Sequence, residues 1–285
     1  MVPMQTIAQA LKTLHPSALA AFSFCERSFW INQHYPTFGG VASLPLVFGN
    51  TVHEAYRVVS DTFRTHWPTL SIATIPAAIP VDVRAAVDFV EKLSTEQHPE
   101  FSLDIRRELP LVEYGLRMWA QQHYNNLVRV YDRADSLDVA VEAVVPETEV
   151  NLVSKKLGLS GRADLLYTTI DKTLQIKDIK TDQRTTTFLK SEGHKLQVLS
   201  YGQMGIETRG LNCDSVGLLY SRDMTEVNYP FNKKNKKFLV DSVTRAREII
   251  ASVIPPPVLD ELEQSAKCPR CYCRQKCMKL AEDMV

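Results

Sequence analysis

The stretch GRADLLYTTIDKTLQIKDIKT, residues 161–181, decides the fold. It contains two runs rich in aliphatic and β-branched residues, separated by the turn-prone IDK at 170–172, and this pattern predicts two consecutive strands. Asp164 lies in the first strand. Asp178 and Lys180 are two residues apart in the second, so their side chains emerge on the same face of the sheet. If the two strands pair as a hairpin, Asp164 comes to lie beside Asp178 and Lys180.

Two carboxylates that converge beside a lysine suit the hydrolysis of phosphodiesters. Hard carboxylate oxygens hold Mg²⁺ or Mn²⁺, and the cationic side chain helps to place or deprotonate the attacking water. The alternative is that these residues are ordinary solvent-facing charges on an antiparallel sheet. The first interpretation gains from His53 upstream and from Gln197 and Tyr201 downstream, which are four residues apart on one face of a predicted helix. Each of these three alone would also suit helix packing.

The sequence around this stretch predicts the remaining elements of the core. A strand is expected over 138–150, a helix over 194–207, a strand over 215–222 and a long helix over 236–254 that ends at three consecutive prolines. The order is helix, three strands, helix, strand. It predicts an α/β fold with a mixed central sheet flanked by helices.

The N-terminal part is predicted to be helical. Residues 15–35 indicate one helix that carries Cys25, with Ser17 as its N-cap, and residues 47–59 indicate a second helix that begins at Gly49 and projects His53 from its first turns. Four regions follow from these patterns: N-terminal helices (1–60), a helical insertion without visible chemistry (61–137), the core (138–254) and a C-terminal cysteine segment (255–285).

The net charge of zero hides an asymmetry along the chain. Residues 82–149 carry 7 basic and 14 acidic side chains, whereas residues 233–279 carry 11 basic and 5 acidic. Such a distribution permits a local phosphate-binding surface on a neutral protein, although the lysines at 233–237 also suit a solvated loop and helix start.

Composition also excludes several classes of protein. With 45% hydrophobic residues the chain can bury an ordinary core. No apolar stretch approaches the roughly 18 residues of a membrane helix, and residues 1–12 lack the apolar centre of a signal peptide. We therefore expect a cytoplasmic protein in a reducing compartment with no membrane partner. The chain has no G-x-x-x-x-G-K-[ST] motif, so it is not expected to be an ATP-driven helicase itself.

Six cysteines stand at positions 25, 213, 268, 271, 273 and 277. A reducing compartment disfavours disulfides, so four cysteines within ten residues indicate a metal site. Cys268, Cys271 and Cys277, with the distant Cys25 as fourth ligand, would satisfy either a 4Fe-4S cluster or a tetrahedral Zn²⁺, and the spacing does not separate the two. Cys273 could replace one of its neighbours or remain free. Cys213 is expected to be structural.

These motifs resemble those of the RecB-like nucleases of the PD-(D/E)XK superfamily, and within them the CRISPR-associated Cas-four exonucleases and the AddB nuclease domain. The resemblance rests on FGNTVHE around His53, GRAD at 161–164, KDIKT at 177–181 and QVLSY at 197–201, and it covers residues 15–60 and 138–278. It implies a restriction-endonuclease-like core.

The resemblance also implies roles for individual residues. His53, Asp164, Asp178 and the carbonyl of Ile179 would be metal ligands, and Lys180 would be the catalytic lysine. Gln197 and Tyr201 would contact DNA or buttress the site. The cysteine spacing and the FCERSFW motif match the iron-sulfur members of the family, which favours a 4Fe-4S staple between the chain ends over zinc. Glu142 is considered as an additional acid from the first strand.

The function expected from this resemblance is that of a metal-dependent DNA exonuclease acting on single strands or DNA ends, in recombination, repair or CRISPR adaptation. Any helicase, integrase or recombinase partner is expected to be a separate protein. Two alternatives remain. One is a noncatalytic, metal-stapled nucleic-acid-binding subunit, which would have no chemical need for His53, Asp164, Asp178 and Lys180 together. The other is a site-specific endonuclease of the same superfamily, which would cut within duplex sites.

Overall fold

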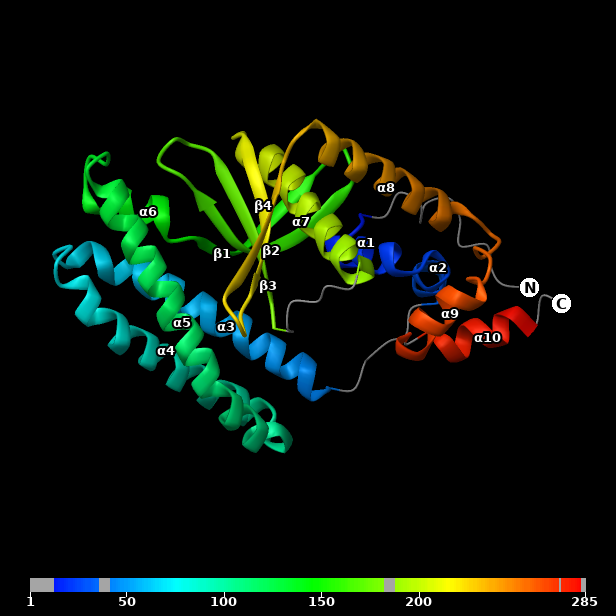
Figure 1. Cartoon of the computed structure of the whole chain (residues 1–285), viewed down its shortest axis with the longest axis horizontal. Helices are drawn as coiled ribbons and strands as arrows, with labels where there is room; N and C mark the ends of the chain where they lie inside the picture. The colour runs from blue at the N-terminus through cyan, green and yellow to red at the C-terminus, as the bar shows by residue number, and fades with distance from the viewer. Residues whose placement is uncertain (1–12, 36–41, 182–187, 272, 283–285) are drawn as a thin grey trace.

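The computed structural model describes residues 13–35, 42–181, 188–271 and 273–282, so the expectation for residues 1–12 lies outside the described part. Figure 1 shows the arrangement of the elements. In chain order they are α1 (Pro16–Phe24), α2 (Glu26–His34), α3 (Leu44–His66), η2 (Trp67–Thr69), α4 (Ile75–Gln97), η3 (Pro99–Phe101), α5 (Ser102–Tyr131), α6 (Leu137–Val144), β1 (Glu147–Ser154), β2 (Leu159–Thr168), β3 (Leu174–Lys180), α7 (Phe188–Arg209), β4 (Cys213–Tyr220), β5 (Thr225–Pro230), α8 (Lys233–Ala251), α9 (Glu261–Lys267), η4 (Cys268–Arg270) and α10 (Arg274–Glu282).

Within the described residues, five strands form one sheet in the order β1-β2-β3-β4-β5. Strands β1, β2 and β3 form an antiparallel meander, α7 crosses over to β4, which is parallel to β3, and β5 returns antiparallel to β4. The predicted mixed sheet and the predicted β2–β3 hairpin are therefore confirmed. None of the helices in the described ranges is both long and apolar enough to cross a membrane.

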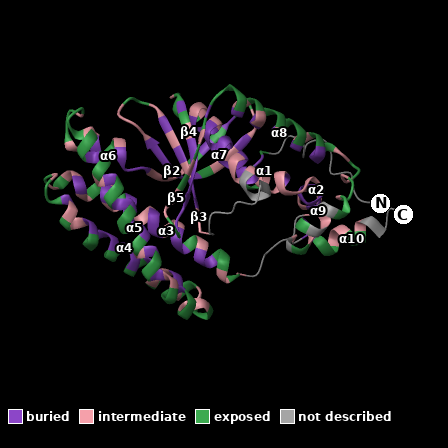
Figure 2. Ribbon diagram, viewed as in Figure 1, coloured by how far each residue is buried: buried purple, intermediate pink, exposed green. Residues whose placement is uncertain are grey.

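Helices cover both faces of the sheet. Helices α3, α4, α5 and α6 share one hydrophobic core with the sheet residues Leu165, Ile179 and Leu219. Helices α1, α2, α7 and α8 build a second core on the opposite face, which includes Leu166 and Leu218 of the same strands. Figure 2 shows the buried residues following the sheet and the helix faces turned towards it. The helical segment 61–137 thus shares a core with the sheet.

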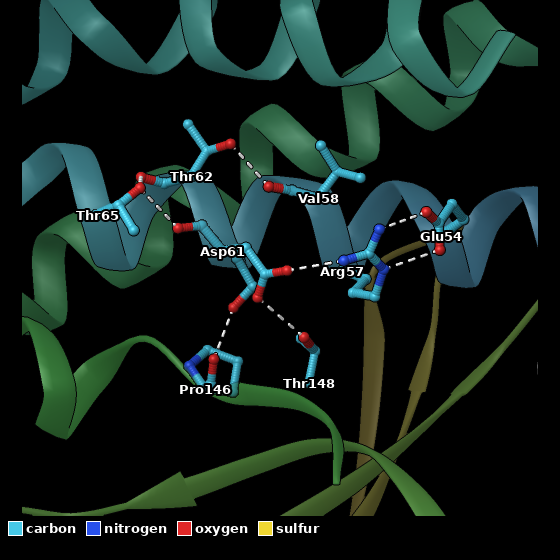
Figure 3. A network of polar contacts seen from close by, with 9 residues as sticks. Glu54, Arg57, Val58, Asp61, Thr62, Thr65, Pro146 and Thr148 are labelled. Carbon is cyan, nitrogen blue, oxygen red and sulfur yellow. Dashed lines mark hydrogen bonds and ion pairs between the residues drawn. The ribbon is translucent and has the colours of Figure 1, made fainter. Parts of the chain in front are cut away.

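Helix α3 is tied to the start of β1. The predicted region boundary at 60 falls inside α3, which continues to His66. Ser60 donates a hydrogen bond to the carbonyl of Pro146 (2.7 Å), and Thr148 donates to Asp61 (3.3 Å). Arg57 also holds Asp61 at 2.9 Å, as Figure 3 shows. These contacts fix the face of α3 that carries His53 against the edge of the sheet.

The strand predicted over 138–150 is wrong in its first half, because Leu137–Val144 is helix α6. Ser136 caps this helix by accepting a hydrogen bond from the amide of Val139 (3.3 Å). The buried residues Ala140, Val141 and Val144 recur at helical spacing. Strand β1 begins only at Glu147. The sequence analysis also missed β5, a short edge strand whose residues alternate between half-buried and exposed.

The N-terminal helices begin and end at other residues than predicted. The single helix expected over 15–35 is broken at Cys25, whose backbone is extended (φ −162°, ψ 115°). Ser17 is not an N-cap, because α1 already starts at Pro16, a favoured first residue of a helix. Helix α3 starts at Leu44, before the predicted Gly49, with Ser43 as an extended N-cap residue and a proline in the first turn.

Candidate active site and cysteine cavity

The pairing of the strands aligns three acidic residues at one level of the sheet. Thr148 pairs with Leu165 and Val150 with Ala163, so Glu149 of β1 lies opposite Asp164 of β2. The neighbouring pair Leu165 and Lys177 places Asp164 opposite Asp178 of β3.

Burial separates these carboxylates from ordinary surface charges. Asp164 is 8% and Asp178 3% exposed, which rules out the interpretation as solvent-facing charges. The amide of Ile179 donates to Asp164 Oδ2 at 2.7 Å, so the peptide that joins Asp178 to Ile179 lies directly beside this carboxylate.

Lys180, Asp178 and Gln197 form a closed triangle between β3 and α7. Lys180 Nζ lies 2.6 Å from Asp178 Oδ2 and donates to Gln197 Oε1 at 3.0 Å. Gln197 Nε2 donates to Asp178 Oδ1 at 2.8 Å. Asp178 Oδ2 is buried and accepts no well-directed hydrogen bond, so its contact with Lys180 is one of charge. Gln197 therefore fixes the relative position of the lysine and the carboxylate.

His53 reaches the acidic row from α3. Its Nδ1 lies 3.2 Å from Asp164 Oδ1. One ligand atom each from His53, Glu149 and Asp164 lie within 4.8 Å of one another, and in the described part of the chain this is the one group of three or more His, Cys, Asp or Glu with that geometry. An imidazole with several carboxylate oxygens is a donor set that Mn²⁺ accepts and Mg²⁺ tolerates.

Glu149 is the site residue that the sequence analysis missed. Its backbone is left-handed (φ 53°), which is uncommon for a residue other than glycine, and Arg162 of β2 forms an ion pair with its carboxylate. Glu142, the acid considered instead, is exposed on α6 and lines a separate hollow with Arg64 and Lys172. The signal for Glu149 was its position opposite the GRAD motif, which becomes visible only when the hairpin register is known.

The electrostatics show a local excess of negative charge. Burial raises the pKa of Asp178, and the charge of Asp164 adds to this while Lys180 opposes it. Burial and Asp164 also raise the pKa of Glu149. Burial lowers the pKa of His53, but its hydrogen bond with Asp164 and the surrounding carboxylates outweigh this, so the net pKa is raised. A divalent cation bound among these carboxylates would offset their mutual repulsion and favour their ionised forms.

Tyr201 lies at the flank of this site on α7 and is 6% exposed. A Cβ atom added to Gly161 of β2 would meet its ring at 3.3 Å and Pro16 of α1 at 2.8 Å. Burial and the charges of Asp178 and Asp164 raise the pKa of the Tyr201 hydroxyl. This packing suits a residue that buttresses the site.

A second site lies between the α1–α2 junction and the C-terminal segment. Its cavity is lined by the four cysteines singled out in the sequence, Cys25, Cys268, Cys271 and Cys277. Burial raises the pKa of Cys25, and the neighbouring Cys271 and Cys277 add to this. The break between α1 and α2 turns Cys25 to the cavity, where its Sγ accepts the amide of Ser28 (3.4 Å).

The other two cysteines do not line this cavity. Cys273 is buried with its Sγ 3.4 Å from Asn32 Oδ1 and 3.9 Å from the carbonyl oxygen of Ser28. Cys213 is buried at the start of β4, and this burial raises the pKa of its thiol to about 12.

Comparison with known proteins identifies the family of this chain. The chain matches the PD-(D/E)XK nuclease superfamily over residues 13–278, and it therefore belongs to this superfamily. Among solved structures, it is similar to a protein from Eubacterium rectale described as "Putative exonuclease", with 10% sequence identity and a TM-score of 0.47 over 97% of this chain and 92% of that one. No curated protein matches the chain.

Proposed function

We propose that the protein is a metal-dependent deoxyribonuclease that hydrolyses phosphodiester bonds at DNA ends or in single-stranded DNA. The observation that carries this proposal is the acidic row of half-buried Glu149 and buried Asp164 and Asp178, with Lys180 paired to Asp178 at 2.6 Å and His53 beside Asp164. The motif resemblance to the Cas-four and AddB nucleases favours exonuclease activity within the superfamily. It also favours a role in recombination, repair or CRISPR adaptation beside a separate helicase, integrase or recombinase.

The donor atoms present fit Mg²⁺ or Mn²⁺. His53, Glu149, Asp164, Asp178 and the Ile179 carbonyl would hold the ion, which when bound would polarise the phosphodiester and acidify a water molecule. The convergence of His53, Glu149 and Asp164 and the raised pKa values of Asp178 and Glu149 are the observations that support such a cation.

Residues of the chain position the attacking water and stabilise the developing charge. Lys180 places the attacking water and offsets the negative charge that develops on the phosphate, since its ammonium is held at a fixed point by Asp178 and Gln197. Tyr201 keeps α7, and with it Gln197, at the correct distance from β2.

We propose further that Cys25, Cys268, Cys271 and Cys277 hold a 4Fe-4S cluster. The four thiols line one cavity, so they can converge on one metal site. Four thiolates would also satisfy a tetrahedral zinc ion. The resemblance of the cysteine motif to the iron-sulfur members of the family favours the cluster over zinc. Such a cluster would join α2 to the C-terminal segment, with Cys273 outside the ligand set.

The test is cleavage of end-labelled single-stranded, duplex and circular DNA by protein purified anaerobically and supplied with Mn²⁺. Lys180→Met and Asp178→Asn should each lower the rate by about a thousandfold or more without unfolding the protein. Lys177→Met is the matched control, because this lysine of the same strand pairs with Glu226 instead (2.6 Å).

The remaining outcomes decide between the candidate activities. Release of nucleotides from ends, with circles left intact, supports an exonuclease. Cleavage of circles at defined sites would replace it by an endonuclease. DNA binding without any cleavage in Mg²⁺ or Mn²⁺ would leave a noncatalytic binding subunit.

A further inference from the structure

Basic side chains line part of the cysteine cavity. Besides its four cysteines, the side chains of Arg27, Lys267 and Arg274 line it, and the other described lining residues are neutral. No aspartate or glutamate is among these described lining residues. Basic side chains around a cavity favour an anionic occupant.

Of the three basic residues, Arg27 is the most deeply buried. It is 4% exposed. Its Nε donates to Cys277 Sγ at 3.2 Å and its Nη1 donates to the carbonyl of Pro256 at 2.7 Å. Its Nη2 is buried and has no hydrogen-bond acceptor, and none of the described carboxylates forms an ion pair with the guanidinium.

A buried guanidinium without a counter-charge is costly, because desolvation of an ion removes several kcal/mol of hydration that only a partner charge restores. Arginine cannot relieve this cost by losing its proton. A negative charge in the cavity that Arg27 lines would offset this cost. The cysteine thiols are the groups there that can supply it, once they are ionised as metal ligands.

We propose that Arg27 is the charge-compensating and positioning residue of the four-cysteine metal site, a proposal that rests on the proposed cluster. Four thiolates outweigh the charge of a 4Fe-4S core or a zinc ion, so the loaded site is anionic. Arg27 stabilises it by its fixed charge and by the N–H···S contact to Cys277. Hydrogen bonds and positive charge near the sulfurs strengthen metal retention and raise the reduction potential of a cluster.

The local backbone explains how one short segment brings both the Cys25 and the Arg27 side chain to the cavity. Cys25 and Arg27 are two residues apart, and on a continuous helix they would point in widely different directions. The extended backbone at Cys25 removes this restriction, so both side chains line the same cavity. The helix break is thus part of the site.

The experiment uses the full chain purified anaerobically, and compares Arg27→Met, Arg27→Lys and the control Arg245→Met. Arg245 is exposed and pairs with Glu26 of α2 at 2.9 Å, but it does not line the cavity. Iron and sulfide per chain, the rate of iron loss to a chelator and the midpoint potential are measured. Arg27→Met should lose iron at least about tenfold faster, and its reduced-to-oxidised ratio should fall about tenfold, or about 59 mV for one electron.

The charge-preserving variant separates charge from shape. Arg27→Lys should keep the potential near that of the wild type, and Arg245→Met should match the wild type in every measurement. If Arg27→Met does not fold, Arg27→Gln takes its place with the same expectation. The proposal would be overturned if Arg27→Lys lost iron and potential as much as the neutral variants do. It would also be overturned if the neutral variants kept the iron content and the midpoint potential of the wild type.

The wild-type metal content distinguishes this inference from the proposals on which it rests. If the wild-type protein holds zinc, the rate at which the variants lose metal to the chelator becomes the deciding measurement. A wild type that holds no metal overturns both the cluster and the role of Arg27. The DNA cleavage assay tests the nuclease independently of either result.

Discussion

Replacing Lys180 by methionine should make the stability of the metal-free protein depend on pH in a new way. The Lys180 and Asp178 side chains are 18% and 4% exposed, so the variant leaves a buried carboxylate without its cation. Removing one partner of a buried ion pair costs about 3–5 kcal/mol. Gln197 still donates to Asp178 Oδ1 at 2.8 Å, which places the expected loss near the lower limit, about 3 kcal/mol or about two pKa units.

The direction in which the unfolding free energy changes with pH follows from the pKa of Asp178, which burial raises to about 6 in the folded protein. A carboxyl group with a raised pKa contributes stability that is present below its unfolded pKa and is lost as the pH rises through the folded pKa. Lys180→Met raises the folded pKa further, so this loss extends to higher pH. The difference in unfolding free energy from the wild type should therefore be small at about pH 5 and approach its full size above about pH 8.

Urea unfolding in the presence of EDTA measures this difference. The double variant Lys180→Met/Asp178→Asn should recover most of the lost stability at high pH, because it removes the orphaned charge. Lys177→Met should cost about 1 kcal/mol or less, since its partner Glu226 is partly exposed. A Lys180→Met penalty that is the same at both pH values, or that persists in the double variant, would refute the assignment of a buried charge pair.

Three further predictions concern other residues. Glu149→Gln should weaken Mn²⁺ binding by about tenfold or more in calorimetric titrations, whereas Glu142→Gln on α6 should not. Gly161→Ala should lower the unfolding free energy by about 1–3 kcal/mol, because its Cβ would meet Pro16 at 2.8 Å, while Gly49→Ala, with its nearest atom at 3.7 Å, should cost nothing in the same assay. Burial lowers the pKa of His123 to about 4, so its contribution to stability, present above about pH 6.5, is lost as the pH falls towards 4, and His123→Gln should flatten that part of the urea-derived profile.

The sequence predicts the parts of the site that depend on local spacing. Side chains alternate along a strand, so Asp178 and Lys180 had to share a face, and a three-residue turn indicated the hairpin that brings Asp164 beside them. In the structure Asp178, Lys180 and Gln197 contact one another, and Asp164 accepts a hydrogen bond from the amide of Ile179, which lies between Asp178 and Lys180 on β3. The mixed sheet also followed from element order alone.

The sequence does not reveal features that depend on long-range packing. Leu137–Val144 contains valines and alanines that suit a strand or a helix, and its helical form depends on the Ser136 cap and on packing against α5. Glu149 enters the site because its backbone turns left-handed opposite Asp164, which no local pattern signals. The sequence predicts only that Arg27 lies in a helix, whereas the structure shows that its side chain lines the cysteine cavity. The helix break at Cys25, which the sequence does not predict, brings both residues to this cavity.

The two sites are mechanically connected through α1. This helix leads directly into Cys25, and its Pro16 lies against Gly161, three residues before Asp164 on β2. A Cβ atom at Gly193 of α7 would meet the carbonyl oxygen of Ala20 at 3.0 Å, so α1 also lies directly on the helix that carries Gln197. Close packing of this kind transmits displacement because it leaves no space to absorb it. A staple that fixes Cys25 therefore also fixes the spacing between β2 and α7, on which the contact of Gln197 with Asp178 and Lys180 depends.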